Sequence, residues 1–260
     1  MIKITTWNVN SIRKRQNLIE KFIKINSPDI LCLQETKVSD KLFPESFFYS
    51  LGYKYLFWAG EDTGYNGVAI ASKYKINQLE SFVFVENSRH IAIQIEDIAL
   101  HNIYIPAGGD IPNPEENPKF KYKLAVLDNL AHWAESIQKS NTIILGDFNV
   151  APMPNDVWSH KQLLDVVSHT PVEVEKLNIF MANGGFIDTS RMFTCPEKKL
   201  YSWWSYRSKN WKLSDRGRRL DHIWVTHPLK DKLIASYINK DFRDMDTPSD
   251  HAPVNIEIKL

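Results

Sequence analysis

Cysteine is scarce in this chain, since only Cys32 and Cys195 occur among the 260 residues and they are far apart. This argues against a disulfide framework and against a zinc site made of Cys-x-x-Cys pairs, and it is typical of a reducing compartment. Cys32 lies in the apolar run at 30–33, where a small buried hydrophobic side chain is expected. We therefore expect a cytoplasmic protein that is stabilised by a hydrophobic core.

Long apolar runs, low-complexity segments and obvious repeats are also lacking. No stretch reaches the roughly 18 apolar residues that a membrane-spanning helix needs. The N-terminus has neither the basic start nor the apolar middle of a signal peptide. Hydrophobic residues make up 43% and charged residues 24% of the chain, as is usual for a globular protein. We expect one domain over residues 1–260, no membrane association, and a monomer without an obligatory protein partner.

An excess of charge of one sign is missing as well, because the net charge is only +1. Basic side chains are nevertheless concentrated in two segments, 1–25 and 207–219, and each segment has a net charge of +5. They could form two solvated faces, or one split surface that contacts phosphates if the fold brings the segments together. Composition leaves both interpretations open. The basic residues are Lys3, Arg13, Lys14, Arg15, Lys21 and Lys24, and Arg207, Lys209, Lys212, Arg216, Arg218 and Arg219.

Apolar β-branched runs alternate with helical patterns, which predicts a layered α/β or α+β protein. Apolar residues at helical spacing predict helices over 11–25 and within 117–139. A third helix should begin at the capping box at 170–173 and end at the glycine pair 184–185. Strands are expected at 1–7, 30–33, 53–58, 67–72, 91–95, 99–105, 142–145, 220–225 and 253–258.

Polar side chains gather where the predicted strands end. Carboxylates, carboxamides and an imidazole along one sheet edge can supply hard oxygen ligands for a cation together with acid and base groups. Each residue also has an ordinary structural explanation: a glutamate can be a solvated charge, Asp and Asn favour turns, and a tyrosine can belong to the core. The residues are Asn8, Asn10, Glu35, Tyr104, Asp147, Asn149, Asp221, Asp250 and His251.

The short motifs around these residues are more informative as an ordered set than singly. That set resembles the exonuclease III and abasic endonuclease family of the DNase I-like superfamily. The resemblance runs from residue 2 to the C-terminus, and F-I-D-T at 186–189 and S-W-W-S-Y-R-S at 202–208 extend it. The motifs that carry it are W-N-V-N at 7–10, L-Q-E-T-K at 33–37, Y-I-P at 104–106, L-G-D-F-N at 145–149, R-L-D at 219–221 and S-D-H-A-P-V at 249–254.

The resemblance implies a four-layer α/β sandwich, in which two mixed β-sheets pack face to face with helices on both outer sides. It also implies a Mg²⁺-dependent DNA phosphodiesterase of base excision repair, with Mn²⁺ as a possible substitute. Such an enzyme would incise duplex DNA 5′ to abasic sites and remove nucleotides or blocking groups from 3′ ends. Double-stranded DNA, abasic or blocked at its 3′ end, is the expected partner.

The resemblance further implies which residues would hold the metal. Glu35 would be the main Mg²⁺ ligand with Asn8 close by, and Asp250 would bind a second ion or shape the site. A Mg²⁺ ion held by few carboxylates keeps coordination positions free for water and for a phosphate oxygen. The number of metal ions stays open.

The catalytic roles implied by the resemblance belong to five residues. Asp147 would deprotonate or orient the attacking water, and Asn149 would hold that water and the phosphate. His251 would face the scissile phosphate and would be oriented by Asp221, because a carboxylate partner can keep an imidazole cationic near neutral pH. Tyr104 would contact the phosphate or steady the leaving oxygen.

An aromatic run and the second basic segment indicate DNA contacts. Such aromatic runs are more often core, but in the resembled family this stretch helps to form an apolar cup for a sugar that lacks its base. Trp203 and Leu220 are the candidate cup residues. Further DNA-contacting candidates are Asn10, Arg13, Arg207, Arg216 and Arg218, and neutralising Arg216 and Arg219 is expected to flatten the salt dependence of DNA binding.

Two positions depart from the pattern of the resembled family. Ala107 stands where many relatives carry Asn or Gln, so a side-chain hydrogen bond to phosphate is missing there. Arg218 stands where some abasic endonucleases have an aromatic residue. Both departures concern substrate preference. Three alternative functions stay open: a mainly 3′→5′ exonuclease with weak abasic incision, a phosphatase or phosphodiesterase acting on small or lipid phosphates, and a non-catalytic binding module. The complete set of catalytic residue types disfavours the binding module.

Overall fold

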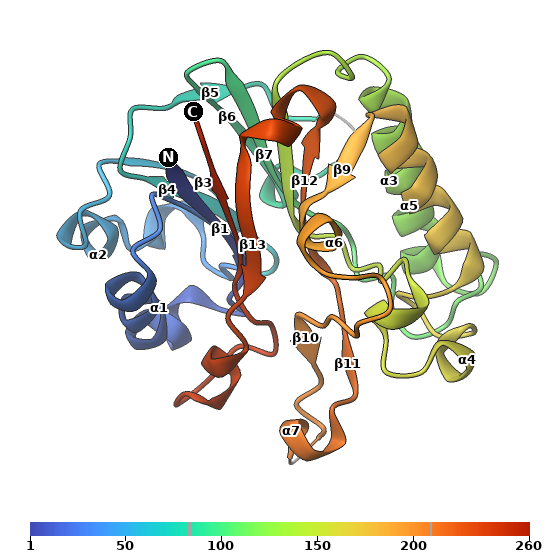
Figure 1. Ribbon diagram of the computed structural model, residues 1–260. Coiled ribbons are helices and arrows are strands. Elements are labelled where there is room, and N and C mark those ends of the chain that lie inside the picture. The colour runs from blue at the N-terminus through green and yellow to red at the C-terminus, as the bar shows by residue number, and fades with distance from the viewer. Residues whose placement is uncertain (83–84, 209) are drawn as a thin grey trace.

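Two six-stranded β-sheets pack face to face in the computed structural model, which describes residues 1–82, 85–208 and 210–260 (Figure 1). The first sheet has the order β13 (Leu233–Ile238), β14 (Val254–Ile258), β1 (Ile2–Asn8), β2 (Ile30–Gln34), β4 (Val68–Ser72) and β3 (Tyr55–Ala59). The second has the order β5 (Asn77–Leu79), β6 (His90–Ile95), β7 (Ile98–Tyr104), β8 (Thr142–Asp147), β12 (Asp221–Thr226) and β9 (Phe186–Asp188).

Both sheets are mixed. In the first sheet β1 is parallel to β2 and antiparallel to β14, and in the second β7 is parallel to β8 while β8 is antiparallel to β12. Because parallel neighbours end at the same edge, the residues that follow β1 and β2, and those that follow β7 and β8, lie together. These two edges hold most of the strand-end residues that the sequence singled out.

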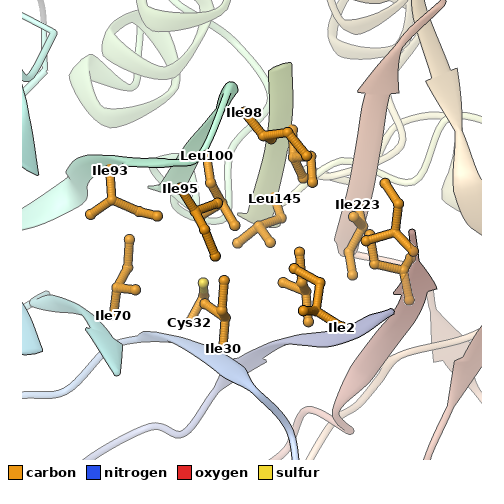
Figure 2. Packing of buried hydrophobic residues seen from close by; sticks show 14 of the residues in the cluster. Ile2, Ile30, Cys32, Ile70, Ile93, Ile95, Ile98, Leu100, Leu145 and Ile223 are labelled. Carbon is orange, nitrogen blue, oxygen red and sulfur yellow. The ribbon is translucent and has the colours of Figure 1, made fainter. Parts of the chain in front are cut away.

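The main core lies between the two sheets. Side chains alternate between the faces of a strand, so Ile30 and Cys32 of β2 point inward and are fully buried. Figure 2 shows them, with Ile70 of β4, opposite Ile93 and Leu145 of the second sheet. Cys32 therefore has the buried hydrophobic role that was expected of it.

Helices cover the outer face of each sheet. Figure 1 shows α1 (Ile12–Asn26) and α2 (Glu45–Ser50) on one outer side, and α3 (Pro118–Ala134) and α5 (Pro171–Asn183) on the other. Leu31 and Leu33 of β2 pack with Phe22 of α1, and Ile144 of β8 packs with Leu127 of α3. Both sheets are thus buried on both faces, and the predicted four-layer sandwich is confirmed.

Three short helices and a two-stranded ribbon complete the fold. Strands β10 (Trp203–Trp204) and β11 (Gly217–Arg218) pair with each other and extend beyond the sheets together with α7 (Trp211–Ser214) (Figure 1). The other short helices are α4 (His160–Leu163) and α6 (Thr189–Phe193). No helix in the described ranges is both long enough and apolar enough to span a membrane.

The elements with a clear periodicity occur close to their predicted positions. The helix expected within 117–139 spans Pro118–Ala134, and turns follow to residue 139. There the hydroxyls of Ser136 and Ser140 donate to the carbonyls of Trp133 and Ile137, three residues before each serine. Such local bonds compete with helical pairing, which is consistent with the end of the helix at Ala134.

Candidate active site

The ends of β1, β2 and β8 place three polar side chains in direct contact. The carboxamide Nδ2 of Asn8 donates to Glu35 Oε1 at 2.8 Å and to Asp147 Oδ2 at 2.9 Å. Asn8 is fully buried, and its Oδ1 accepts the main-chain N–H of Asn10. The side chain of Asn8 therefore joins the two sheets through one carboxylate on each.

Glu35 is the more accessible of the two carboxylates. Its Oε1 also accepts a hydrogen bond from the Tyr104 hydroxyl at 3.0 Å, and its Oε2 pairs with Lys37 Nζ at 2.6 Å. Burial together with the charges of Glu35 and Asp147 raises the pKa of Tyr104 well above its usual value, so the phenol stays protonated as a donor. Glu35 has a positive φ of 49°, a conformation that is uncommon outside glycine and concentrated at functional sites.

Asp147 is buried at the end of β8, where it lies opposite Asp221 in the antiparallel ladder. Its Oδ1 accepts the main-chain N–H of Asn149 at 2.9 Å, and its Oδ2 accepts Asn149 Nδ2 at 3.2 Å. Burial raises the pKa of Asp147 to about 7, against the opposing effect of the His251 charge. A carboxylate with this pKa can exchange a proton near neutral pH.

His251 and Asp221 form a buried hydrogen-bonded pair beside Asp147. The distance from His251 Nδ1 to Asp221 Oδ2 is 2.8 Å, and that from Nε2 to Asp147 Oδ2 is 3.7 Å. Burial lowers the pKa of His251, but Asp221 and Asp147 outweigh it and raise this pKa to about 10. The imidazole is therefore a cation at neutral pH. Ser202, which sequence reasoning missed, donates its hydroxyl to the same Asp221 oxygen at 2.6 Å.

Ligand atoms of Asp147, Asp221 and His251 lie within 4.8 Å of one another, so this group could hold a metal ion. Within this group His251 Nδ1 and Asp221 Oδ2 are already hydrogen-bonded to each other. Glu35 and Asp147 offer oxygen donors instead, as a hard divalent cation prefers. Asn8 orients its NH₂ toward these two carboxylates, and each oxygen of Asp250 accepts one hydrogen bond, from Asn10 and from Trp203. The metal-ligand roles of Asn8 and Asp250 stay predictions.

These groups open into a cleft of about 930 Å³. Asn8 and Asp221 are buried behind its surface, Asn10 is partly buried, and Arg13 is exposed at the start of α1, so these four do not line it. The predicted site residues that do line the cleft are Glu35, Tyr104, Asp147, Asn149, Trp203, Arg207, Arg216, Arg218, Leu220, Asp250 and His251.

Comparison with known proteins identifies this arrangement. The sequence profile described as "Endonuclease/Exonuclease/phosphatase family" matches residues 5–251. The chain belongs to the endonuclease/exonuclease/phosphatase family. Exodeoxyribonuclease III of Haemophilus influenzae is 29% identical over 277 residues, which cover 99% of this chain and 100% of that protein. The exodeoxyribonuclease of Bacillus subtilis is 28% identical over 278 residues, which cover both chains fully.

Solved structures of this family superimpose along the whole chain. An AP endonuclease from Archaeoglobus fulgidus has a TM-score of 0.91 and 33% sequence identity, with 100% of both chains covered. The structure of the 3′ phosphatase NExo from Neisseria, bound to a product DNA hairpin, has a TM-score of 0.89 and 30% identity, again with 100% of both chains covered. The predicted family and fold are thus confirmed.

In this family member an apolar wall adjoins the carboxylates. Trp203 and Leu220, the predicted cup residues, pack with Trp158, Leu163 and Val166 along one side of the cleft. The last three lie between β8 and α5, with Leu163 at the end of α4, in a stretch where no sequence pattern indicated a function. Ala107 also lines the cleft, and its carbonyl accepts a hydrogen bond from the buried Lys123.

The two basic segments lie near each other, but they are not uniformly basic surfaces. Arg15 Nη2 of the first segment donates to the hydroxyl of Tyr206, the residue before the second segment, at 2.8 Å. Arg15 is itself buried, and Lys209 lies outside the described residues. The expectation for Arg219 is wrong: its guanidinium is fully buried and pairs with Asp156 and Asp188, so it cannot reach DNA.

Proposed function

We propose that residues 1–260 form one catalytic domain, a Mg²⁺-dependent phosphodiesterase that incises duplex DNA 5′ to abasic sites and processes 3′ ends. The observation that carries this proposal is the juxtaposition of the Glu35 and Asp147 carboxylates with the His251–Asp221 pair in one cleft beside an apolar wall. The names of relatives across the whole chain, exodeoxyribonuclease III and AP endonuclease, support the same assignment.

The charges of the site suit attack on a phosphodiester, which is anionic and repels a nucleophile. Glu35 would hold the cation, which when bound neutralises phosphate charge. His251 would donate a hydrogen bond to a phosphate oxygen as charge develops there. Asp221 holds His251 in its cationic form and in place.

The attacking water would be oriented by Asp147 and Asn149. The N–H and carboxamide of Asn149 both donate to Asp147, and the Asn149 carboxamide also donates to the carbonyl of Ile105 at 2.9 Å. These bonds fix the two side chains relative to each other, so a water bound by Asp147 would have a defined direction of attack. Asp147 would accept its proton, which the raised pKa of Asp147 favours.

The substrate class follows from the apolar wall. A sugar that has lost its base is small enough to turn into a recess bounded by Trp203, Leu220 and Trp158, and unstacking costs least at such a damaged site. Relatives that match over the whole chain are named as exodeoxyribonucleases and as an AP endonuclease, which favours DNA over a small or lipid phosphate. DNA is therefore the favoured substrate.

The proposal is tested with two labelled duplexes, one with a central abasic analogue and one intact with a recessed 3′ end, in Mg²⁺ or EDTA. Fast Mg²⁺-dependent incision on the 5′ side of the lesion is expected, with Asp147→Asn as the control against a contaminating nuclease. Trimming of 3′ ends alone would restrict the function to the exonuclease. Hydrolysis of bis(4-nitrophenyl) phosphate with both duplexes intact would refute the DNA assignment.

A further inference from the structure

Arg218 has an unusual environment for an arginine at the edge of a cleft. It lies on β11 directly opposite Trp203 of β10, and its guanidinium carbon is 5.3 Å from the centroid of the Trp203 ring. Its Nη1 donates to the carbonyl of Val167 at 3.0 Å and to Ser168 Oγ at 2.7 Å. The side chain is therefore held in one orientation by a ring and by two oxygen acceptors.

The acid whose charge acts on Arg218 is Glu173, which is already paired with Lys123. Among the described residues no carboxylate forms an ion pair with Arg218, whereas its neighbour Arg219 is paired with Asp156 and Asp188. Nε of Arg218 is buried without a hydrogen-bond partner. Nη2 has no hydrogen bond to a described residue either, and it is not fully buried, while Arg218 lines the cleft. A fixed and unpaired guanidinium favours an anion, and phosphate suits its planar geometry.

The position of Arg218 relates this anion site to the reactive groups. Trp203 forms an isolated β-bridge with His251 and also pairs with Arg218. The main chain of Arg218 is thus two strand spacings, about 10 Å, from the main chain of His251. Arg218 lies across Trp203 from His251, beside the recess lined by Trp203 and Leu220. If the 5′ phosphate of a sugar in this recess lies at His251, the 3′ oxygen of that sugar points away from His251.

We infer that Arg218 binds the phosphate on the 3′ side of the residue that enters the recess, while the phosphate on the 5′ side is cleaved. This inference rests on the proposed function, because that function sets the polarity of the strand. It makes Arg218 a determinant of substrate choice: an internal abasic residue and a 3′-phosphorylated terminal one supply the second phosphate, whereas a terminal residue with a free 3′ hydroxyl does not.

Three duplexes of identical sequence test the inference. Each carries the tetrahydrofuran abasic analogue, placed internally, at the 3′ end with a phosphate, or at the 3′ end with a free hydroxyl. For Arg218→Gln, kcat/KM on the first two should fall roughly 10- to 100-fold, the usual effect of losing a hydrogen bond to a charged group. The third substrate should change less than about 3-fold, because it lacks the contacted phosphate.

Two further variants keep the outcome interpretable. Arg218→Lys retains the charge without the planar fork, so it should recover part of the loss on the phosphate-bearing substrates. Lys139→Gln removes an exposed charge after α3, outside the cleft, and should leave the ratio among the three substrates unchanged. Equal losses of Arg218→Gln on all three duplexes, or no loss, would overturn the inference alone. Failure of the wild-type protein to cut any of them would overturn the proposed function as well.

Discussion

At the scale of single residues, the charge of the active site depends on Asp221. Asp221→Asn keeps the shape of the side chain but removes the negative charge that stabilises protonated His251 at 2.8 Å. We expect kcat to fall by about 100-fold or more while KM for duplex DNA changes little, since the lost interaction acts on developing charge. Steady-state kinetics on an abasic duplex measures both constants. An unchanged kcat with a raised KM would mean that the pair only positions DNA.

Gly146 is a second residue with a specific requirement. It lies in β8 with a φ of 139°, and a Cβ there would be 1.8 Å from the carbonyl oxygen of Ile103 in β7. Gly146→Ala should therefore lower the free energy of unfolding by at least about 2 kcal/mol. Gly52→Ala is the matched control, because Gly52 also has a positive φ of 90° but open space around it. Urea unfolding of both variants checks this, and equal losses would show that φ alone matters.

At this scale the sequence predicted which residues carry chemical groups of the site better than it predicted the environment of each side chain. Glu35 and Asp147 could be placed at strand ends because the apolar runs before them are clear. Arg218 and Arg219 are adjacent and chemically identical, yet one faces the cleft and the other is buried between Asp156 and Asp188. Their partners lie far away in the sequence, so a basic segment alone could not distinguish them.

At the scale of elements, a buried ion pair connects two helices to the loops of the active site. Lys123 of α3 is fully buried, pairs with Glu173 of α5, and donates to the carbonyl of Asn149 at 2.8 Å. Glu173 also forms the capping box with Thr170 that the sequence predicted. The capping box is a local pattern, whereas the bond to Lys123 spans 50 residues and could not be inferred.

Breaking this pair should affect both stability and catalysis. Lys123→Met leaves Glu173 buried without a counter-charge, which we expect to cost about 3–5 kcal/mol of unfolding free energy. The double variant Lys123→Met, Glu173→Gln should recover part of that stability, because the uncompensated charge is removed. Its kcat should stay low, since nothing then holds the Asn149 carbonyl. Denaturant unfolding and kcat are measured for both variants, and a full return of kcat in the double variant would limit the pair to a structural role.

At the scale of the whole molecule, the layered architecture was predictable because both sheets are buried on both faces. Apolar runs such as 30–33 and 142–145 therefore stand out in the sequence. Strand β13 escaped prediction because a register shift between Leu233 and Ala235 interrupts its alternation, and β5, β9, β10 and β11 are only two or three residues long. How the strands order into two sheets depends on contacts between distant segments, which no local pattern contains.

The buried histidines link the folded state to pH. Burial lowers the pKa of His101 to about 4. Burial and the nearby charge of Arg219 lower the pKa of His222 to about 4 as well. The pKa of His90 is also lowered well below its usual value by burial. In the unfolded chain these imidazoles bind protons near pH 6.5. Between about pH 6.5 and 4 these three imidazoles therefore bind more protons in the unfolded state, and their contribution lowers folding stability as the pH falls. The raised pKa of Asp147 acts in the opposite direction through the same window. The raised pKa of His251 stabilises the folded state below pH 6.5, so its contribution is constant through this window.

The contribution of one of these imidazoles to the pH dependence of the free energy of unfolding can be measured. His101→Gln removes a proton-binding group from the unfolded state, so its free energy of unfolding should decrease less between pH 7 and pH 4.5, by roughly 1–3 kcal/mol relative to the wild-type protein. His227→Gln is the control, because His227 is exposed and forms no ion pair with a described residue, so the pH dependence of this variant's stability should match that of the wild-type protein. Urea titrations at the two pH values give both differences. If His101→Gln retained the wild-type slope, His101 would bind its proton equally in both states, and the acid sensitivity of the fold would have to come from the remaining buried groups, His90 and His222 first.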